Sequence, residues 1–159
     1  MKTEAPDNAG VIAPPPLIFA ITLVAGIWLH RKFPIRAALS LPRNMRLVLA
    51  GSLIAAALAT ITSAVLMMIR ARTNPDPHQP TTAIVVDGPY RFTRNPIYLG
   101  LTLCYSGLII LFNALAGLLL LPIALIIMQR GVIEREESYL ERKFGEQYLS
   151  YKQRVRRWL

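Results

Sequence analysis

The sequence has one cysteine, two histidines and few acidic residues, and each shortage excludes a class of protein. Cys104 alone cannot form an internal disulfide, which excludes a fold held together by disulfides. His78 stands in a proline-rich stretch without the spacing of a ligand cluster, so we expect no metal site. No Gly-x-Gly-x-x-Gly pattern is present, and no signal peptide is expected from the first residues.

The shortage of acid leaves a large excess of positive charge. Eighteen Lys and Arg residues face nine Asp and Glu residues, which gives a net charge of +9. No basic stripe stands apart from the apolar segments, so nucleic-acid binding is not expected. On a membrane protein such an excess attracts anionic head groups and sets topology.

Long apolar runs are what the sequence has in abundance. Hydrophobic residues make up 53% of the chain and the mean hydropathy is +0.40. Residues 47–69 are 23 residues without a charge, about 34 Å as a helix and enough to cross a bilayer. Residues 97–128 are 32 uncharged residues, about 48 Å as one helix and too long for a single span. They predict a helical hairpin turning near Phe112-Asn113-Ala114, or one long tilted helix.

These runs predict an all-α integral membrane bundle of about four transmembrane helices, followed by a cytosolic helical segment. The first helix starts near Val11 and either crosses the bilayer or stays shallow. The charged segment after Met128 has apolar residues at helical spacing and a break at Phe144-Gly145. The expected single domain comprises a disordered lead (1–10), two membrane helices (11–69), a cofactor loop (70–96), the hairpin (97–128) and C-terminal helices that cover the cofactor (129–159).

The distribution of basic residues predicts the orientation. With four spans, the N-terminus, the 70–96 loop and the C-terminal segment share one side with 13 Lys and Arg residues, and the connector 31–46 places five on the other. The positive-inside bias puts the 13 in the cytoplasm, which predicts an inner-membrane protein whose active site faces the cytoplasm. The five basic residues on the opposite side go against this bias. A first helix that does not fully cross the bilayer would remove that conflict.

The stretch 88–100 combines turn signals with polar residues directly before an apolar run. Gly88-Pro89 and Asn95-Pro96 mark turns, and Pro96 suits the first turn of a helix. On the predicted topology this loop faces the segment 134–157, which brings Arg94 and its neighbours near Glu136 and Glu137. Each cluster alone is typical of a solvated face. Together they predict a charged, aromatic and half-buried site at the mouth of the bundle, suited to a zwitterionic cofactor with an aromatic ring.

The order and spacing of these pieces resemble a known family. Residues 88–91, 94–100, 136–140, 144–151 and Val155 resemble isoprenylcysteine carboxyl methyltransferases and, equally, small bacterial membrane methyltransferases and phospholipid N-methyltransferases. The resemblance covers about half of the chain, residues 75–157. It implies a membrane-embedded methyltransferase that uses S-adenosylmethionine from the cytosol and a lipophilic acceptor from the bilayer, in contact with membrane lipids and without a metal or nucleic acid.

The resemblance also implies which residues form the site. The cofactor would be enclosed by Gly88, Pro89, Tyr90, Arg94, Asn95, Pro96, Tyr98, Glu136, Glu137, Tyr148 and Tyr151. Arg94, Glu137 and Arg156 are the expected catalytic residues. Many members of the family have histidine where this chain has Asn95, and an amide takes no proton at neutral pH, so we expect no base at this position.

The acceptor decides the chemistry that the side chains must perform. The expected acceptor is the carboxylate of an isoprenylated cysteine or a similar group, which is already ionised and which Arg94 or Arg156 would orient. For a phospholipid amine or a thiol, Glu136 or Glu137 would accept the departing proton. A membrane reductase that uses NADPH is an alternative function, because such enzymes do not need the glycine motif. A non-enzymatic scaffold is another, although it leaves the charged cluster without a purpose.

Overall fold

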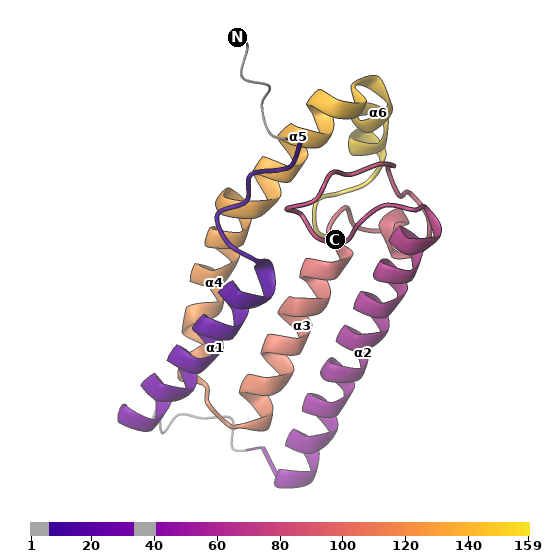
Figure 1. Cartoon of the computed structure of the whole chain (residues 1–159). Coiled ribbons are helices and arrows are strands. Elements are labelled where there is room, and N and C mark those ends of the chain that lie inside the picture. Colours follow the sequence, from indigo (N-terminus) through magenta and orange to yellow (C-terminus); the bar gives the residue numbers. More distant parts are fainter. Residues whose placement is uncertain (1–6, 34–40) are drawn as a thin grey trace.

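The computed structural model describes residues 7–33 and 41–159, and within these ranges it is helical and contains no strand. Figure 1 shows long helices running side by side, with a loop and short helices gathered at one end. The elements are α1 (Pro15–Lys32), α2 (Arg43–Arg70), the 3₁₀ turn η1 (Gly88–Arg91), α3 (Pro96–Leu111), α4 (Ala116–Met128), the π-helical η2 (Gln129–Ile133), α5 (Glu134–Phe144) and α6 (Glu146–Arg154).

The all-α class is confirmed, and four membrane crossings are not. Two helices are long and apolar enough to cross a bilayer, namely α2 and the continuous helix Ala116–Phe144. The apolar part of the second helix ends with Ile133, because α5 beyond it is rich in charge. Helix α3 is apolar but shorter. The expected run 97–128 is two helices separated by residues 112–115, where Asn113 has a positive φ of 52°.

Small residues bring α2 and α3 close together. A Cβ on Gly100 would lie 3.1 Å from the carbonyl oxygen of Ala57, and one on Gly107 would lie 3.1 Å from that of Ala50. Ala50, Ala57 and Ala64 are accordingly fully buried on α2. Close backbone approach is how helices associate where the hydrophobic effect is weak.

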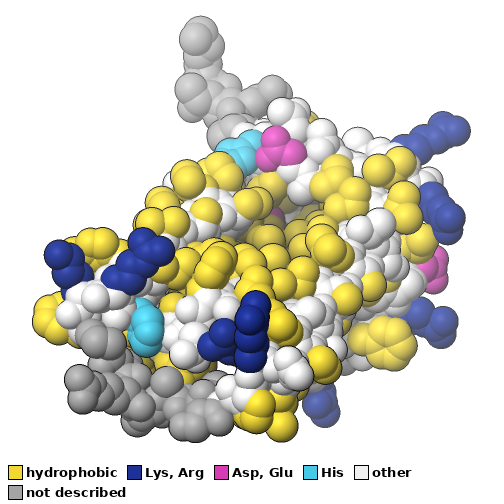
Figure 2. Space-filling model, turned by 90° about the horizontal axis from the view of Figure 1, so that it is seen from below, with side chains coloured by type: hydrophobic (Ala, Val, Ile, Leu, Met, Phe, Trp, Pro, Cys, Tyr) yellow, Lys and Arg dark blue, Asp and Glu magenta, His cyan; other side chains and the backbone are white. Residues whose placement is uncertain are grey.

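Helix α3 packs against the other long helices, and none of its residues is exposed. Helix α1 packs mainly on α4 and, less extensively, on α3, while α2 packs on α3. Figure 2 looks at the bundle from the end opposite the loop and shows hydrophobic side chains around a hollow in this face, with Lys and Arg mainly at the edges. The exposed apolar residues on the helices match the lipid-facing surface of a membrane protein.

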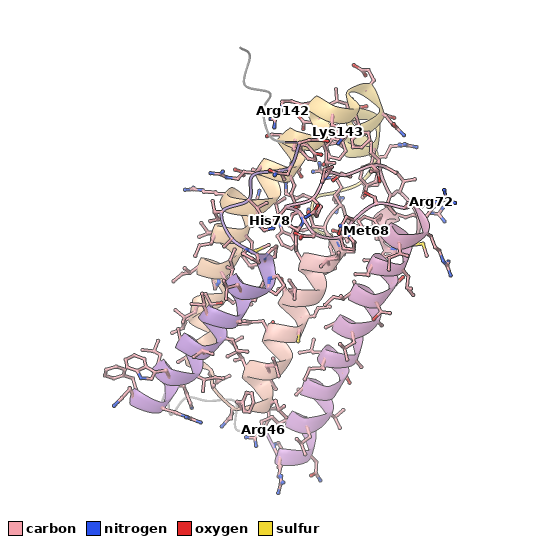
Figure 3. All side chains as sticks on the ribbon, viewed as in Figure 1. Arg46, Met68, Arg72, His78, Arg142 and Lys143 are labelled. Carbon is pink, nitrogen blue, oxygen red and sulfur yellow. The ribbon has the colours of Figure 1, made fainter. Side chains whose placement is uncertain are left out.

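The two ends of the bundle differ. Arg46 lies at one end, and Met68 and His78 lie at the other, where α5 carries Arg142 and Lys143 (Figure 3). Of the expected basic connector 31–46, residues 34–40 lie outside the described part, as do residues 1–6 of the expected lead.

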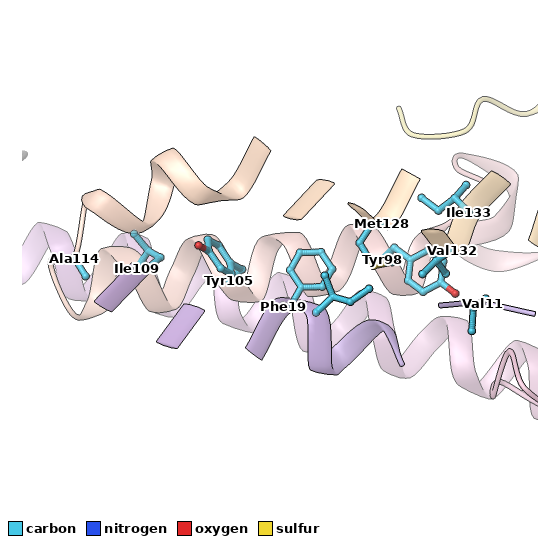
Figure 4. Packing of buried hydrophobic residues seen from close by; sticks show 10 residues of the cluster. Val11, Phe19, Tyr98, Tyr105, Ile109, Ala114, Met128, Val132 and Ile133 are labelled. Carbon is cyan, nitrogen blue, oxygen red and sulfur yellow. The ribbon is translucent and has the colours of Figure 1, made fainter. Parts of the chain in front are cut away.

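The core lies where α1, α3 and α4 meet. Phe19, Tyr105, Ile109 and Met128 are buried there (Figure 4). The Tyr105 hydroxyl donates a hydrogen bond to the Gly117 carbonyl at 2.7 Å, which ties α3 to α4. Buried tyrosine hydroxyls need such partners. This core fixes α3 and α4 as the support for the site above them.

Residues 7–10, the described part of the expected lead, contact α5. Lys143 donates to both carboxylate oxygens of Asp7 at 2.7 Å, and Arg135 donates to the Gly10 carbonyl at 2.9 Å. The Ile12 amide donates to the Gly131 carbonyl at 3.1 Å. These contacts hold the segment before α1 along η2 and α5, so the lead forms part of the wall at the loop end.

Candidate functional site

A pocket lies at the loop end of the bundle, between the loop after α2, the start of α3, and helices α5 and α6. It encloses about 860 Å³ counted out to its open mouth. Its lining includes charged, aromatic and apolar residues drawn from segments far apart in the sequence. A mostly apolar pocket with a few converging polar groups is typical of a small-molecule site.

Glu137 is the centre of an ion cluster in this pocket. It is only 5% exposed. Arg157 binds it with two parallel bonds, Nε to Oε1 at 2.9 Å and Nη2 to Oε2 at 2.6 Å. Arg94 Nη1 lies 3.2 Å from Oε1, and Lys152 Nζ lies 4.0 Å from Oε2. The carboxylate is therefore occupied by cations, and its geometry is that of a positioning group.

Arg94 keeps hydrogen-bonding capacity that the protein does not use. Its side chain is 9% exposed, and its Nε and Nη1 atoms are buried without a hydrogen-bond partner among the described residues. Nη1 has only the charge contact with Glu137. Buried donors without partners are costly and are rare in folded proteins. A guanidinium that lines a pocket with free N–H groups is suited to bind a carboxylate there.

Glu136 is the second carboxylate that lines the pocket. It accepts a hydrogen bond from the Tyr98 hydroxyl at 2.5 Å, and no cation pairs with it within the described ranges. It lies on α5, beyond the apolar part of its helix. Loss of hydration raises the pKa of Glu136 to about 7, although the Tyr98 hydrogen bond opposes the shift. Glu136 therefore keeps its proton to a higher pH than an exposed glutamate does.

Aromatic side chains from two helical elements form another wall. The rings of Tyr148 and Tyr151 lie 6.1 Å apart at 57°. The Tyr151 hydroxyl donates to the Tyr90 carbonyl at 2.8 Å, which fixes α6 against η1. Burial raises the pKa of Tyr148 to about 12 and that of Tyr151 further, so both remain neutral. Neutral rings of this kind offer stacking surfaces.

The C-terminal tail pairs with the turn before α3. The Arg94 amide donates to the Arg156 carbonyl at 2.9 Å, and the Asn95 side-chain amide donates to the Arg157 carbonyl at 2.9 Å. The Thr93 hydroxyl donates to the same Arg157 carbonyl at 3.0 Å. Asn95 thus positions the tail, and the two stretches that were expected to meet do lie together.

Tyr139 connects two parts of the pocket wall, the loop after α2 and the segment before α1, and neither contact was expected from the sequence. Its hydroxyl accepts a hydrogen bond from the Thr81 amide at 3.2 Å and donates to Asp7 at 2.8 Å. Residues 74–77, 81 and 83–85 of the loop also line the pocket, together with Ala9 and Met68. The loop has no periodicity from which a side-chain direction could be read, and the contact with Asp7 spans 132 positions.

The structure brings most of the expected site residues together and leaves three outside. Those that line the pocket are Tyr90, Arg94, Asn95, Pro96, Tyr98, Glu136, Glu137, Tyr148 and Tyr151. Gly88 and Pro89 instead form the turn that presents Tyr90, with Gly88 at a positive φ of 60°. The side chain of Arg156 is exposed and does not line the pocket, whereas its neighbour Arg157 contacts Glu137.

Comparison with known proteins places this arrangement in a family. Residues 45–147, well over half of the chain, match the sequence pattern of the family described as phospholipid methyltransferase. The chain belongs to the phospholipid methyltransferase family. This family is part of the isoprenylcysteine and phospholipid methyltransferase group, so the resemblance read from the sequence is confirmed. The family implies methyl transfer to a lipid-type acceptor.

One curated protein matches part of this member of the phospholipid methyltransferase family. An uncharacterized protein of Haemophilus influenzae is 55% identical over 47 residues, which are 30% of this chain and 73% of the relative. No solved structure matches the chain at a significant level. Membership of a methyltransferase family implies S-adenosylmethionine as the methyl donor.

Proposed function

We propose that the pocket binds S-adenosylmethionine and that the protein methylates the polar head of a lipid drawn from the bilayer. When bound, this cofactor supplies an electrophilic methyl group on a sulfonium. The single observation that carries the proposal is the combination of buried, unpartnered donors on Arg94 with the uncompensated carboxylate of Glu136 in one pocket. A zwitterionic amino-acid tail and ribose hydroxyls need both kinds of group.

The residues of the pocket fit this cofactor. Arg94 Nε would hold the carboxylate of its amino-acid tail, because it has no hydrogen-bond partner among the described residues, whereas Nη1 already faces Glu137. Tyr148 and Tyr151 offer ring faces for the adenine. Glu137 would keep Arg94 in place. Holding the reactants in line and excluding water is the main service that a protein gives to such a displacement, and positioning can supply up to about 7–11 kcal/mol.

An apolar path on α3 supports access from the bilayer. Ile97 lines the pocket, and Leu101, Cys104 and Leu108 follow it on one helical face, all of them half-buried. This face lies between the residues that contact α2 and those in the core. We propose that the hydrocarbon tail of the acceptor lies along it.

We propose an amine as the acceptor group. An ammonium must lose a proton first, and its freed nitrogen lone pair would then form the new bond to the methyl carbon that the cofactor supplies, with the electron pair of the broken carbon–sulfur bond staying on sulfur. The proton of the ammonium goes to Glu136, whose pKa near 7 suits this transfer. The carboxylate of an isoprenylated cysteine is the second candidate, favoured by the free donors of Arg94, and needs no proton transfer.

We further propose that the pocket end faces the cytoplasm and that the protein resides in the inner membrane. The described basic residues lie mostly at this end, on the loop after α2 and on α5, α6 and the tail. The positive-inside bias supports that orientation.

Ligand binding and product analysis test the function. S-adenosylhomocysteine should raise the thermal unfolding temperature of the purified protein, and NADPH should not. Labelled S-adenosylmethionine, added to native membranes with the protein, should transfer its methyl group to an extractable lipid whose head is then identified. Stabilisation by NADPH alone would instead indicate the reductase. A labelled methyl ester would select the carboxylate, and the absence of any labelled lipid would refute methyl transfer to lipids.

A further inference from the structure

A second hollow lies on the other face of α3. Successive residues of a helix turn by about 100°, so Leu99 lies about 160° around α3 from Ile97, which lines the pocket. Leu99 and Thr102 form one side of an open groove of about 930 Å³, counted out to its mouth as for the first pocket, and Leu125 and Ile126 of α4 form the other. We call this the α3–α4 groove.

The groove changes from apolar to polar along its length. Its floor is Leu99, Leu125 and Ile126, whereas Gln129 and Trp158 lie at its upper rim. The rim lies where the apolar helix α4 gives way to the charged helix α5. Such a boundary is where hydrocarbon meets head groups, and tryptophan favours that depth.

The uncompensated charge in the groove is positive. Arg130 lines the rim, is exposed, and forms no ion pair within the described ranges. Glu134, the acidic residue there, accepts a hydrogen bond from Gln129 at 3.1 Å and lies 3.9 Å from Arg157 Nη1. Its charge is thus shared with a cation of the ion cluster, while Arg130 has no such partner.

We propose that the α3–α4 groove binds a bilayer phospholipid of net negative charge, with Arg130 at the phosphate, Trp158 beside the glycerol region and an acyl chain on the apolar floor. The amphipathic lining and the cation at the rim select this occupant. A free phosphate would use the cation but not the floor, and an apolar partner would use the floor but not the cation. This lipid is distinct from the methyl acceptor, and the inference does not depend on the reaction.

Trp158 also connects the groove to the tail that closes the pocket. Its indole N–H donates to Gln129 Oε1 at 3.4 Å, and its neighbour Arg157 holds Glu137. A phospholipid seated against Trp158 therefore stabilises the tail in the position that the ion cluster needs.

Quenching of Trp158 fluorescence by brominated lipids tests the inference. The other tryptophan, Trp28, lies near the C-terminal end of α1. The substitution W28F therefore leaves Trp158 as the only tryptophan of the chain. In phosphatidylcholine vesicles, chain-brominated phosphatidylglycerol should reach half-maximal quenching at about a fivefold lower mole fraction than brominated phosphatidylcholine, since one basic residue at a membrane surface contributes about 1 kcal/mol.

Two matched variants give the control. Arg130→Gln in the W28F background should abolish the preference, and Arg135→Gln, which removes the same charge from the side that contacts Gly10, should retain it. Circular dichroism should show that both variants keep their helices. Equal quenching by the two lipids, no quenching by either, or a preference that survives Arg130→Gln would overturn the inference. Phosphatidylglycerol carries no amine, so failure of the proposed reaction would leave the result unaffected.

Discussion

Replacing Glu137 with glutamine tests whether the ion cluster holds the site together. The substitution keeps the shape of the side chain and removes the charge that Arg94 and Arg157 share. Removing one partner of a buried ion pair costs about 3–5 kcal/mol, because the remaining charge is left uncompensated. Arg94 is nearly buried and Arg157 is 31% exposed, so water relieves part of the cost for the second. We expect a loss of about 3 kcal/mol.

For a chain of this length, that loss corresponds to a decrease of about 6–12 °C in the unfolding temperature. It can be measured by thermal unfolding of the purified protein in detergent. Calorimetric titration with S-adenosylhomocysteine should show at least a tenfold weaker affinity, since Arg94 loses the carboxylate that orients it. The variant should still insert into membranes, because the change lies outside the apolar helices.

Glu141→Gln is the matched control on the same helix. Glu141 pairs with Lys152 at 2.5 Å, and both side chains are about one third exposed. Exposed pairs contribute about 0.2–1 kcal/mol, so this variant should unfold within about 4 °C of the native protein and bind ligand normally. If Glu137→Gln behaved like Glu141→Gln in both assays, the assignment of Glu137 as the group that positions Arg94 would be wrong.

Three further outcomes follow from the contacts of the site and the bundle. Glu136 has a raised pKa of about 7, so its carboxylate forms as the pH rises from 6 to 8. The affinity for cationic S-adenosylmethionine, measured by equilibrium binding, should therefore increase several-fold over this range. In Glu136→Gln the affinity should not change with pH. Gly107→Ala should lower stability by about 1–3 kcal/mol in denaturant unfolding because its Cβ would lie 2.8 Å from Ile54, and Gly51→Ala, with open space around it, should not. Tyr139→Phe loses two long-range hydrogen bonds and should speed hydrogen exchange in residues 74–85; unchanged exchange would show that the tyrosine does not fasten the loop.

The parts of this fold that the sequence predicts are those with a local signal. Uninterrupted apolar runs predicted α2 and the pair α3 and α4, and Gly145, at a positive φ of 52°, ends α5 where the sequence placed a break. Pro96 begins α3 as expected. The number of membrane crossings had no such signal, because α3 is short and α1 carries basic residues in its last turn.

The site was predicted as far as helical periodicity and the resemblance reach, and the misses occur where the backbone leaves the helix. Val155 has extended dihedrals, φ −121° and ψ 131°, so the face that Tyr148 and Tyr151 share does not continue into the tail. That change of conformation turns the side chain of Arg157, rather than that of Arg156, towards Glu137. Asp7 could not be found either, because its partners on α5 are more than 130 positions away.

The scarcity of acidic residues explains why α5 organises the whole loop end. Four of the nine Asp and Glu residues in the chain lie on this one helix. The segments that it gathers are basic: Arg94 before α3, Lys152 on α6 and Arg157 in the tail would repel one another if they met alone. The carboxylate of Glu137 lies within 4.0 Å of all three, and Glu134 and Glu141 neutralise parts of the rim. Glu136 is left over from this neutralisation, next to Tyr98 and facing the pocket. Glu136 is thus a pocket carboxylate that no cation of the described chain neutralises, and for this reason we propose that the cationic group of the ligand lies there.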